Sequence, residues 1–210
     1  MVTAIEAHAL EVGSIDGRTG ISPQILAVMG AVPRHLFVPE SLRDLAYTDA
    51  PLPIGAGQTI SQPFIVALMT DLLRLSPDVI VLEVGTGSGY QAAVLAMLAA
   101  HVYSIEIIPT LAAEASERLV QLGYTNVSVR TGDGYAGWPD AAPFDGILVT
   151  AGARHIPPPL LDQLRPGGRM VIPEGETPSA QQLMLVEKQQ DGTITSRPLL
   201  PVRFVPFTRR

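Results

Sequence analysis

The residues best suited to chemistry form a glycine-rich segment that directly follows an apolar run. Residues 81–89 read VLEVGTGSG in one-letter code. Glycines where a strand hands over to a helix let the backbone turn sharply and approach a ligand with no Cβ in the way. The segment therefore predicts a ligand-binding loop, and a tight turn without a ligand is the alternative. The candidate ligand-binding residues here are Glu83, Gly85, Thr86, Gly87, Ser88 and Gly89.

Two acidic residues downstream of the loop suit a nucleoside. Glu106 ends a second apolar run about twenty residues on, where a carboxylate can accept both hydroxyls of a ribose. Asp133, followed by Gly134, comes after a third run, where a carboxylate can accept an adenine amino hydrogen. An exposed acid at Glu106 and a plain turn at Asp133 are the alternatives.

The spacing of the glycines separates the classes of nucleotide. The loop reads G-x-G-x-G, whereas the dinucleotide fingerprint is G-x-G-x-x-G. No lysine follows the loop, as one does in P-loop proteins that bind nucleoside triphosphates. The loop, Glu106 and Asp133 together fit S-adenosylmethionine best. An NAD-dependent oxidoreductase is the alternative for this region taken alone.

An alternation of apolar runs and helical patterns must position this loop. Strands are expected at residues 79–82, 102–107, 127–130, 144–150 and 169–173, and helices at 90–99 and 111–122. Such an alternation indicates an α/β fold with a doubly wound, mostly parallel sheet. Two further runs, 183–187 and 194–196, flank Asp191-Gly192. This hairpin signal predicts an antiparallel C-terminal edge.

The first third of the chain is rich in turn signals. Ser22-Pro23 predicts a helix start, with Gly30 at its end. Residues 50–63 carry several prolines and glycines and predict an extended, rigid loop, after which a helix runs from about Pro63 through Leu72. Pro157-Pro158-Pro159 is expected to stiffen a loop and start a helix.

The composition of the chain excludes several classes of protein. The 210 residues, 47% of them apolar, suit one globular domain. The formal charge of −6 and the lack of a basic run argue against a nucleic-acid partner. No segment has the pattern of a signal peptide or of a membrane span, so we expect a cytoplasmic monomer that does not contact membranes.

Neither a metal site nor a nucleophile–base arrangement is evident. The chain has no cysteine, which excludes disulfides and thiolate ligands. His8, His35, His101 and His155 lack metal-ligand spacing and are interpreted as structural, so no metal is expected.

Residues 57–63, GQTISQP, are more specific than the glycine loop. They resemble the signature of the protein-L-isoaspartate O-methyltransferase family, and the resemblance covers nearly the whole chain from about Val32. Two departures are a loosely matching first thirty residues and Glu174, where the family more often has a small apolar residue. Further matching segments are 32–39, 52–55, 81–90, 132–138, 144–150, 164–173 and 202–206.

The resemblance implies one methyltransferase domain over residues 1–210. Residues 1–75 would form an N-terminal substrate and lid segment, 76–175 the cofactor-binding core, and 176–210 a C-terminal β-hairpin. The implied reaction moves a methyl group from S-adenosylmethionine, leaving S-adenosylhomocysteine, to the free α-carboxylate of L-isoaspartyl residues in damaged proteins and peptides.

The same resemblance implies roles for particular residues. Ser61 would be the catalytic residue, donating its hydroxyl to the substrate carboxylate, and it would also belong to the cofactor-binding residues. Gln58, Thr59 and Ile60 would cover the cofactor as a lid. Backbone amides near Phe204 and Val205 would also hold the carboxylate. Taken alone, Ser61 would be an ordinary helix N-cap.

The implied chemistry needs no general base. An α-carboxylate has a pKa of roughly 3.5 and is ionised at neutral pH, so it can attack a sulfonium methyl directly. Two other functions stay open on the residues alone. One is a methyltransferase with a different acceptor, and the other is a cofactor-binding module without acceptor chemistry.

Overall fold

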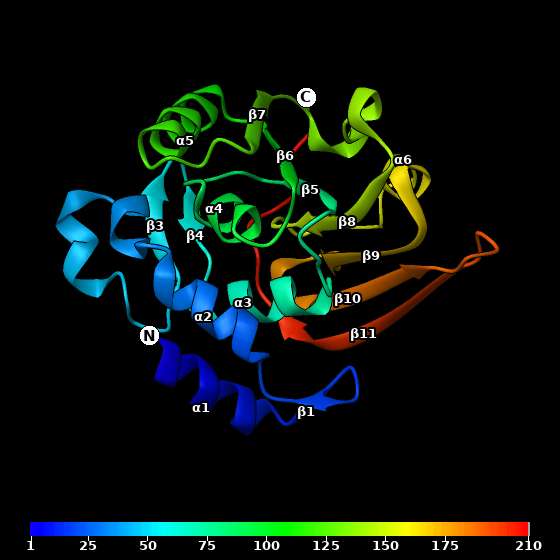
Figure 1. The fold of residues 1–210 in the computed structure, drawn as a ribbon, viewed down its shortest axis with the longest axis horizontal. Helices are drawn as coiled ribbons and strands as arrows, with labels where there is room; N and C mark the ends of the chain where they lie inside the picture. The colour runs from blue at the N-terminus through cyan, green and yellow to red at the C-terminus, as the bar shows by residue number, and fades with distance from the viewer. Residues whose placement is uncertain (210) are drawn as a thin grey trace.

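A seven-stranded sheet organises the computed structural model, which describes residues 1–209 (Figure 1). The strand order is β11-β10-β9-β8-β5-β6-β7. β5 to β9 run parallel, whereas β10 pairs antiparallel with both β9 and β11. The strands are β5 (Ile80–Val84), β6 (His101–Glu106), β7 (Val127–Thr131), β8 (Phe144–Val149), β9 (Leu164–Glu174), β10 (Gln181–Lys188) and β11 (Ile194–Val202). The prediction of a mostly parallel α/β sheet with an antiparallel C-terminal edge is confirmed.

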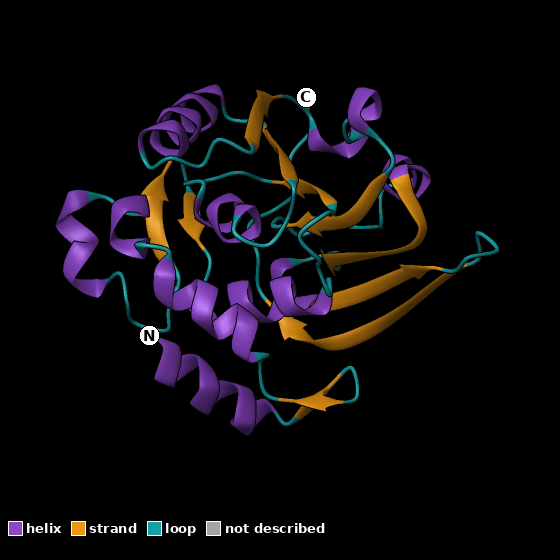
Figure 2. Cartoon of the chain, in the orientation of Figure 1, coloured by secondary structure: helices purple, strands orange, loops and turns teal. Residues whose placement is uncertain are grey.

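Helices cover both faces of this sheet (Figure 2). Val81 packs with the helices on one face and Leu82 with α6 on the other, because successive strand residues point to opposite sides. This explains why the central strands read as continuous apolar runs. The α-helices are α1 (Val2–Val12), α2 (Pro23–Ala31), α3 (Pro63–Leu72), α4 (Tyr90–Ala96), α5 (Pro109–Gln121) and α6 (Pro158–Gln163). The 3-10 helices are η1 (Arg34–Phe37), η2 (Glu40–Leu45), η3 (Gly134–Ala136), η4 (Pro139–Ala141) and η5 (Pro178–Ala180).

The N-terminal part differs most from the sequence prediction. Residues 50–63 contain a hairpin of β3 (Leu52–Gly55) and β4 (Gln58–Ile60) rather than an extended loop. Its turn residues Ala56 and Gly57 have φ of 50° and 71°, the conformation that closes tight hairpins. α1 was not predicted, and neither was a small hairpin of β1 (Ser14–Ile15) and β2 (Arg18–Thr19), whose strands of two residues carry no readable periodicity.

The helix starts and the hairpin turn that were predicted from prolines and glycines are present in the structure. α2 begins at Pro23 and α6 at Pro158, as proline in the first helical turn indicates. Gly192 has a φ of 86° in the turn between β10 and β11. Ser22 is the N-cap of α2, but its side chain accepts no capping hydrogen bond.

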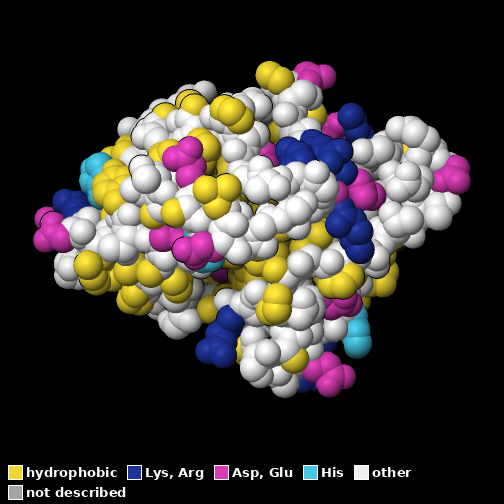
Figure 3. Space-filling model, turned by 90° about the horizontal axis from the view of Figure 1, so that it is seen from below, with side chains coloured by type: hydrophobic (Ala, Val, Ile, Leu, Met, Phe, Trp, Pro, Cys, Tyr) yellow, Lys and Arg dark blue, Asp and Glu magenta, His cyan; other side chains and the backbone are white. Residues whose placement is uncertain are grey.

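The surface shown in Figure 3 carries basic and acidic side chains interspersed among apolar and neutral polar ones. Among residues 1–209, no helix has both the length and the apolar character that a membrane span requires.

Candidate active site

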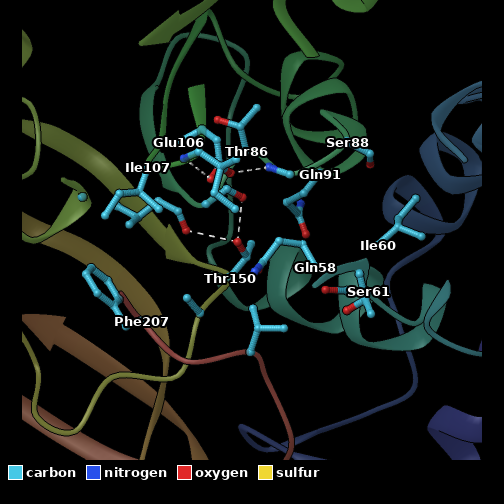
Figure 4. Close-up of a pocket in the computed structure, with 18 of the residues that line it drawn as sticks. Gln58, Ile60, Ser61, Thr86, Ser88, Gln91, Glu106, Ile107, Thr150 and Phe207 are labelled. Carbon is cyan, nitrogen blue, oxygen red and sulfur yellow. Dashed lines mark hydrogen bonds between the residues drawn. The ribbon is translucent and has the colours of Figure 1, made fainter. Parts of the chain in front are cut away.

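A cavity lies at the carboxyl ends of β5, β6 and β8, where ligands bind in open α/β sheets (Figure 4). Ser61 and Ile60 lie on one side of it, and Ile107 and Phe207 on the other. The lining residues are Gln58, Thr59, Ile60, Ser61, Val66, Val84, Gly85, Thr86, Gly87, Ser88, Tyr90, Gln91, Ile105, Glu106, Ile107, Ile108, Gly134, Thr150, Ala151, Val205, Pro206, Phe207 and Thr208.

The predicted glycine loop forms one wall of the cavity. Gly85, Gly87 and Gly89 have φ of 98°, 52° and 86°, which side-chain-bearing residues rarely adopt. A Cβ at Gly85 would lie 2.2 Å from Thr150 Oγ1, and this hydroxyl donates to the Gly85 carbonyl at 2.7 Å. The loop therefore needs glycine both for its conformation and for its approach to the end of β8. Gly89 does not line the cavity but is the left-handed N-cap of α4.

Glu106 is the one charged side chain among the described lining residues. It is 5% exposed, and its two carboxylate oxygens accept from the Gly87 amide at 2.8 Å and the Ile108 amide at 3.0 Å. An ionised carboxylate has about four acceptor sites, so it can still accept from a ligand. The cavity therefore suits hydroxyl donors and a ligand of positive or zero net charge, and it lacks the basic groups that phosphates need.

Glu83 lies beneath the loop instead of lining the cavity. Its side chain is fully buried and accepts a hydrogen bond from Ser104 Oγ, which in turn lies 2.5 Å from Thr86 Oγ1. Burial raises the pKa of Glu83 to about 8, although the Ser104 hydrogen bond opposes the rise. The carboxyl is accordingly protonated at neutral pH and supports Thr86 from below.

Asp133 also lies outside the lining residues, whereas Gly134 is among them. One Asp133 oxygen accepts from the Tyr135 amide at 2.9 Å, and the other lies 3.6 Å from Arg209 Nε. Arg209 also stands over the Tyr135 ring, with its Cζ 3.6 Å from the ring centroid. The C-terminal tail thus reaches the end of the cavity that Asp133 flanks.

Ser61 faces the cavity from the turn between β4 and α3. Gln62, and not Ser61, is the N-cap of α3. The Ser61 hydroxyl makes no hydrogen bond with any other residue in the range 1–209, while its carbonyl accepts from Arg34 Nη2 at 2.8 Å. Arg34 is fully buried and also lies over the Tyr90 ring, 4.8 Å from its centroid. Burial lowers the pKa of Arg34, and the nearby Tyr90 and Asp49 counteract the change.

A groove of about 520 Å³ adjoins the cavity. Its walls come from α1, the start of α3, η5, and the end of β11 with the segment that follows it. The two spaces meet at four residues that line both, which are Thr59, Ser61, Thr150 and Val205.

The structure corrects the expectation for Phe204. Its amide was predicted to donate to a substrate, but it donates to Gln181 Oε1 at 2.6 Å, and its side chain lines the groove. The Val205 amide, in contrast, has no acceptor among residues 1–209, and Val205 lines both spaces. Of the two predicted amides, the one at Val205 is therefore free to bind a ligand.

Comparison with known proteins agrees with this geometry. Residues 7–210 match the model of the family described as Protein-L-isoaspartate(D-aspartate) O-methyltransferase (PCMT). The chain belongs to this family. The family was predicted from residues 57–63 and the segments around them, and this prediction is confirmed.

Relatives within the PCMT family match over almost the whole chain. Protein-L-isoaspartate O-methyltransferase 2 of Syntrophobacter fumaroxidans is 61% identical over 99% of this chain and 84% of its own. The protein of the same name from a Polaromonas species is 60% identical over 99% of both chains.

Solved structures show the same fold. A protein-L-isoaspartate O-methyltransferase structure matches with a TM-score of 0.82 and 29% identity, over 98% of this chain and 65% of that one. A putative member from Plasmodium falciparum, solved in complex with S-adenosyl-L-homocysteine, matches with a TM-score of 0.81 and 24% identity, over 100% of this chain and 97% of that one.

Sequence reasoning missed several lining residues of this PCMT-family site. Thr150 and Ala151 directly follow β8, and Ile107 follows β6, so the position of ligands at the carboxyl ends of strands could have indicated them. Tyr90 and Phe207 gave no such signal, because an aromatic at a helix start and another near the chain end read as ordinary packing residues.

Proposed function

We propose that the chain transfers a methyl group from S-adenosylmethionine to the free α-carboxylate of L-isoaspartyl residues in damaged proteins and peptides, with S-adenosylhomocysteine as the other product. One observation carries the proposal. A cavity with a single carboxylate and no basic side chain among its described lining residues adjoins, at Ser61, a groove of about 520 Å³.

The cavity residues fit this cofactor. S-adenosylmethionine, when bound, supplies an electrophilic methyl group on a positively charged sulfur and carries no phosphate. Glu106 would accept the ribose hydroxyls, and residues 85–88 of the glycine loop would pack against the bound nucleoside, with Gly89 allowing the turn into α4. Asp133 and Gly134 would lie at the adenine end, with Glu83 contributing through Thr86. Gln58, Thr59 and Ile60, on β4 opposite the loop, would cover the cofactor.

The acceptor would be held by neutral donors. The Ser61 hydroxyl and the Val205 amide are both free of other partners among residues 1–209, and both lie where groove and cavity meet. Neutral donors orient a carboxylate without the strong ground-state stabilisation of a direct Arg pair. Orienting it in a near-attack pose can remove on the order of 7–11 kcal/mol of the barrier.

These positions support a division of the chain into three parts with different roles. Residues 1–75 would form the substrate and lid segment, since β4 contributes to the cavity and His8 to the groove. Residues 76–175 would hold the cofactor. Residues 176–210 would supply the C-terminal hairpin and the tail that brings Val205 to the junction.

Mass spectrometry of a short isoaspartyl peptide tests the proposal. Incubation with the protein and S-adenosylmethionine should add one methyl group, and fragmentation should place it on the α-carboxylate of the isoaspartyl residue. An unmodified peptide, under conditions where binding of S-adenosylhomocysteine is shown by calorimetry, would refute the acceptor. Failure of that binding would refute the cofactor as well.

A further inference from the structure

Gln181 is a buried polar side chain that none of the preceding chemistry uses. It begins β10, is 2% exposed, and directs its amide at the backbone of Phe204. Its Oε1 accepts from the Phe204 amide at 2.6 Å, and its Nε2 lies 3.3 Å from the Phe204 carbonyl, to which it donates. One side chain thus binds both backbone polar groups of the residue just before Val205.

The segment that Gln181 holds has left the sheet and depends on other anchors. β11 ends at Val202, so Phe204 and Val205 have no strand partners of their own within residues 1–209. Gly152 provides the second anchor, because its amide donates to the Val205 carbonyl at 2.8 Å and its carbonyl accepts from the Phe207 amide at 2.9 Å. A Cβ at Gly152 would lie 1.9 Å from Gln181 Nε2, so the two anchors pack directly against each other.

These anchors leave one backbone donor free where the cavity and the groove meet. The Phe204 amide is occupied by Gln181, while the Val205 amide next to it has no acceptor among the described residues. We infer that Gln181 is a positioning residue that fixes Phe204 so that the Val205 amide points at the acceptor carboxylate. The inference rests on the proposed function, because it assigns Gln181 a part in orienting that carboxylate.

Gln181→Met tests this role, since methionine has a similar volume but forms neither hydrogen bond. A small displacement of a reacting group costs on the order of 10²-fold in rate, so we expect kcat/KM for an isoaspartyl peptide to fall about 10- to 100-fold. The affinity for S-adenosylhomocysteine should change less than about threefold, because the lost contacts lie on the acceptor side.

Gln163→Met is a matched control. Gln163 is 8% exposed and binds backbone in the same manner, accepting from the Trp138 amide at 2.7 Å and donating to the Ala136 carbonyl at 2.8 Å. At a temperature where circular dichroism shows both variants folded, and with saturating cofactor, Gln163→Met should keep kcat/KM within about threefold. Equal losses in both variants, or full activity of Gln181→Met, would overturn the inference.

Gln181→Glu adds a readout that a purely structural role would not change. A protonated glutamic acid keeps one donor and one acceptor, whereas the ionised form has no donor and repels the Phe204 carbonyl. The activity of the variant relative to wild type should therefore fall as pH rises, and a ratio that stays constant with pH would contradict the role. If wild type itself methylates no isoaspartyl peptide, the proposed function fails, whereas an active wild type with an equally active Gln181→Met refutes only the positioning role.

Discussion

At the scale of single residues, the proposed site combines neutral hydrogen-bonding groups with one carboxylate. Ser61 and the Val205 amide are free donors where the cavity and the groove meet, and Glu106 is the one charged side chain among the described residues that line the cavity. An α-carboxylate acceptor is already ionised at neutral pH, so the proposed reaction needs no general base.

Replacing Ser61 by alanine should slow transfer while leaving the cofactor site intact. Loss of one positioned donor should lower kcat/KM for an isoaspartyl peptide about 10- to 100-fold. The affinity for S-adenosylhomocysteine should stay within about threefold in a calorimetric titration. Ser196→Ala, at an exposed position on β11, is the control. An unchanged kcat/KM in the Ser61 variant would remove Ser61 from the catalytic role.

Glu83 should make the stability of the fold depend on pH. Burial raises the pKa of Glu83 from 4.5 in the unfolded chain to about 8 in the folded protein. Between these values the folded state holds a proton that the unfolded state has lost, so the free energy of unfolding should decrease as pH rises. Glu83→Gln, which stays neutral, should lack this decrease.

Urea denaturation of both proteins across the range between about pH 5 and 8 measures this difference. Glu114→Gln, at an exposed position on α5, should retain the wild-type slope. Parallel curves for wild type and Glu83→Gln would show that the buried carboxyl is ionised in the folded protein.

Sequence patterns predicted the position of the glycine loop beside the cavity better than they predicted individual contacts. The G-x-G-x-G spacing and Glu106 located one wall of the cavity, because backbone conformation and strand ends follow from local sequence. They could not show that Glu83 lies below the wall, or that the Phe204 amide is already bonded to Gln181. Both facts depend on side chains from strands distant in sequence.

At the scale of secondary-structure elements, the loop between β5 and α4 explains why glycine is required at position 85. The loop between them turns through positive φ at Gly85 and brings its backbone against Thr150 at the end of β8. A side chain at this position would meet both a conformational and a steric cost.

Gly85→Ala should therefore lose both stability and cofactor binding. We expect a cost of about 2–4 kcal/mol, because positive φ and a contact of Cβ with Thr150 Oγ1 add together. Gly192→Ala is a matched control, since Gly192 has a φ of 86° and a Cβ added there would meet no atom within 4 Å. It should cost about 1 kcal/mol and leave affinity for S-adenosylhomocysteine unchanged. Equal effects on thermal unfolding and affinity would contradict the steric argument.

The regular elements of the core were predictable, and the irregular ones were not. β5 to β9 follow from apolar runs separated by helical patterns, and the signal is strongest for β5 and β8, which are buried on both faces. The β3–β4 hairpin was hidden by prolines at positions 51 and 53, which suggested a rigid loop. Prolines are tolerated there because this two-stranded hairpin has free edges.

At the scale of the whole molecule, an ion cluster fastens the N-terminal hairpin to the sheet. Asp16, in the turn between β1 and β2, is 9% exposed and bonds to Arg74 at 2.8 Å, to Arg169 at 3.0 Å, and to Arg197. Burial alone would raise the pKa of Asp16, but the hydrogen bond and charge of Arg169, aided by Arg74 and Arg197, hold it below its usual range. Figure 1 shows α1 and β1 together at one end of the molecule.

Asp16→Asn should destabilise the protein by about 2–3 kcal/mol near neutral pH, because the largely buried Arg169 guanidinium loses an anionic partner. Because the pKa of Asp16 is lower in the folded protein than its ordinary value of 3.8, the ionised carboxylate stabilises the folded state at pH values above 3.8. This stabilisation is lost as the pH falls through the pKa of the folded state. The difference between wild type and Asp16→Asn in urea denaturation should accordingly shrink in acid. Asp44→Asn, at an exposed position on η2, should change the free energy of unfolding little. Similar losses for both variants would show that the cluster does not hold the hairpin.

The central claim, transfer of a methyl group to isoaspartyl carboxylates, is tested most directly by a matched pair of peptides. The two would differ only in carrying an isoaspartyl or a normal aspartyl residue, and each would be incubated with the protein and methyl-labelled S-adenosylmethionine. We predict base-labile label on the isoaspartyl peptide alone. Label on both peptides, or on neither while the cofactor binds, would contradict the account.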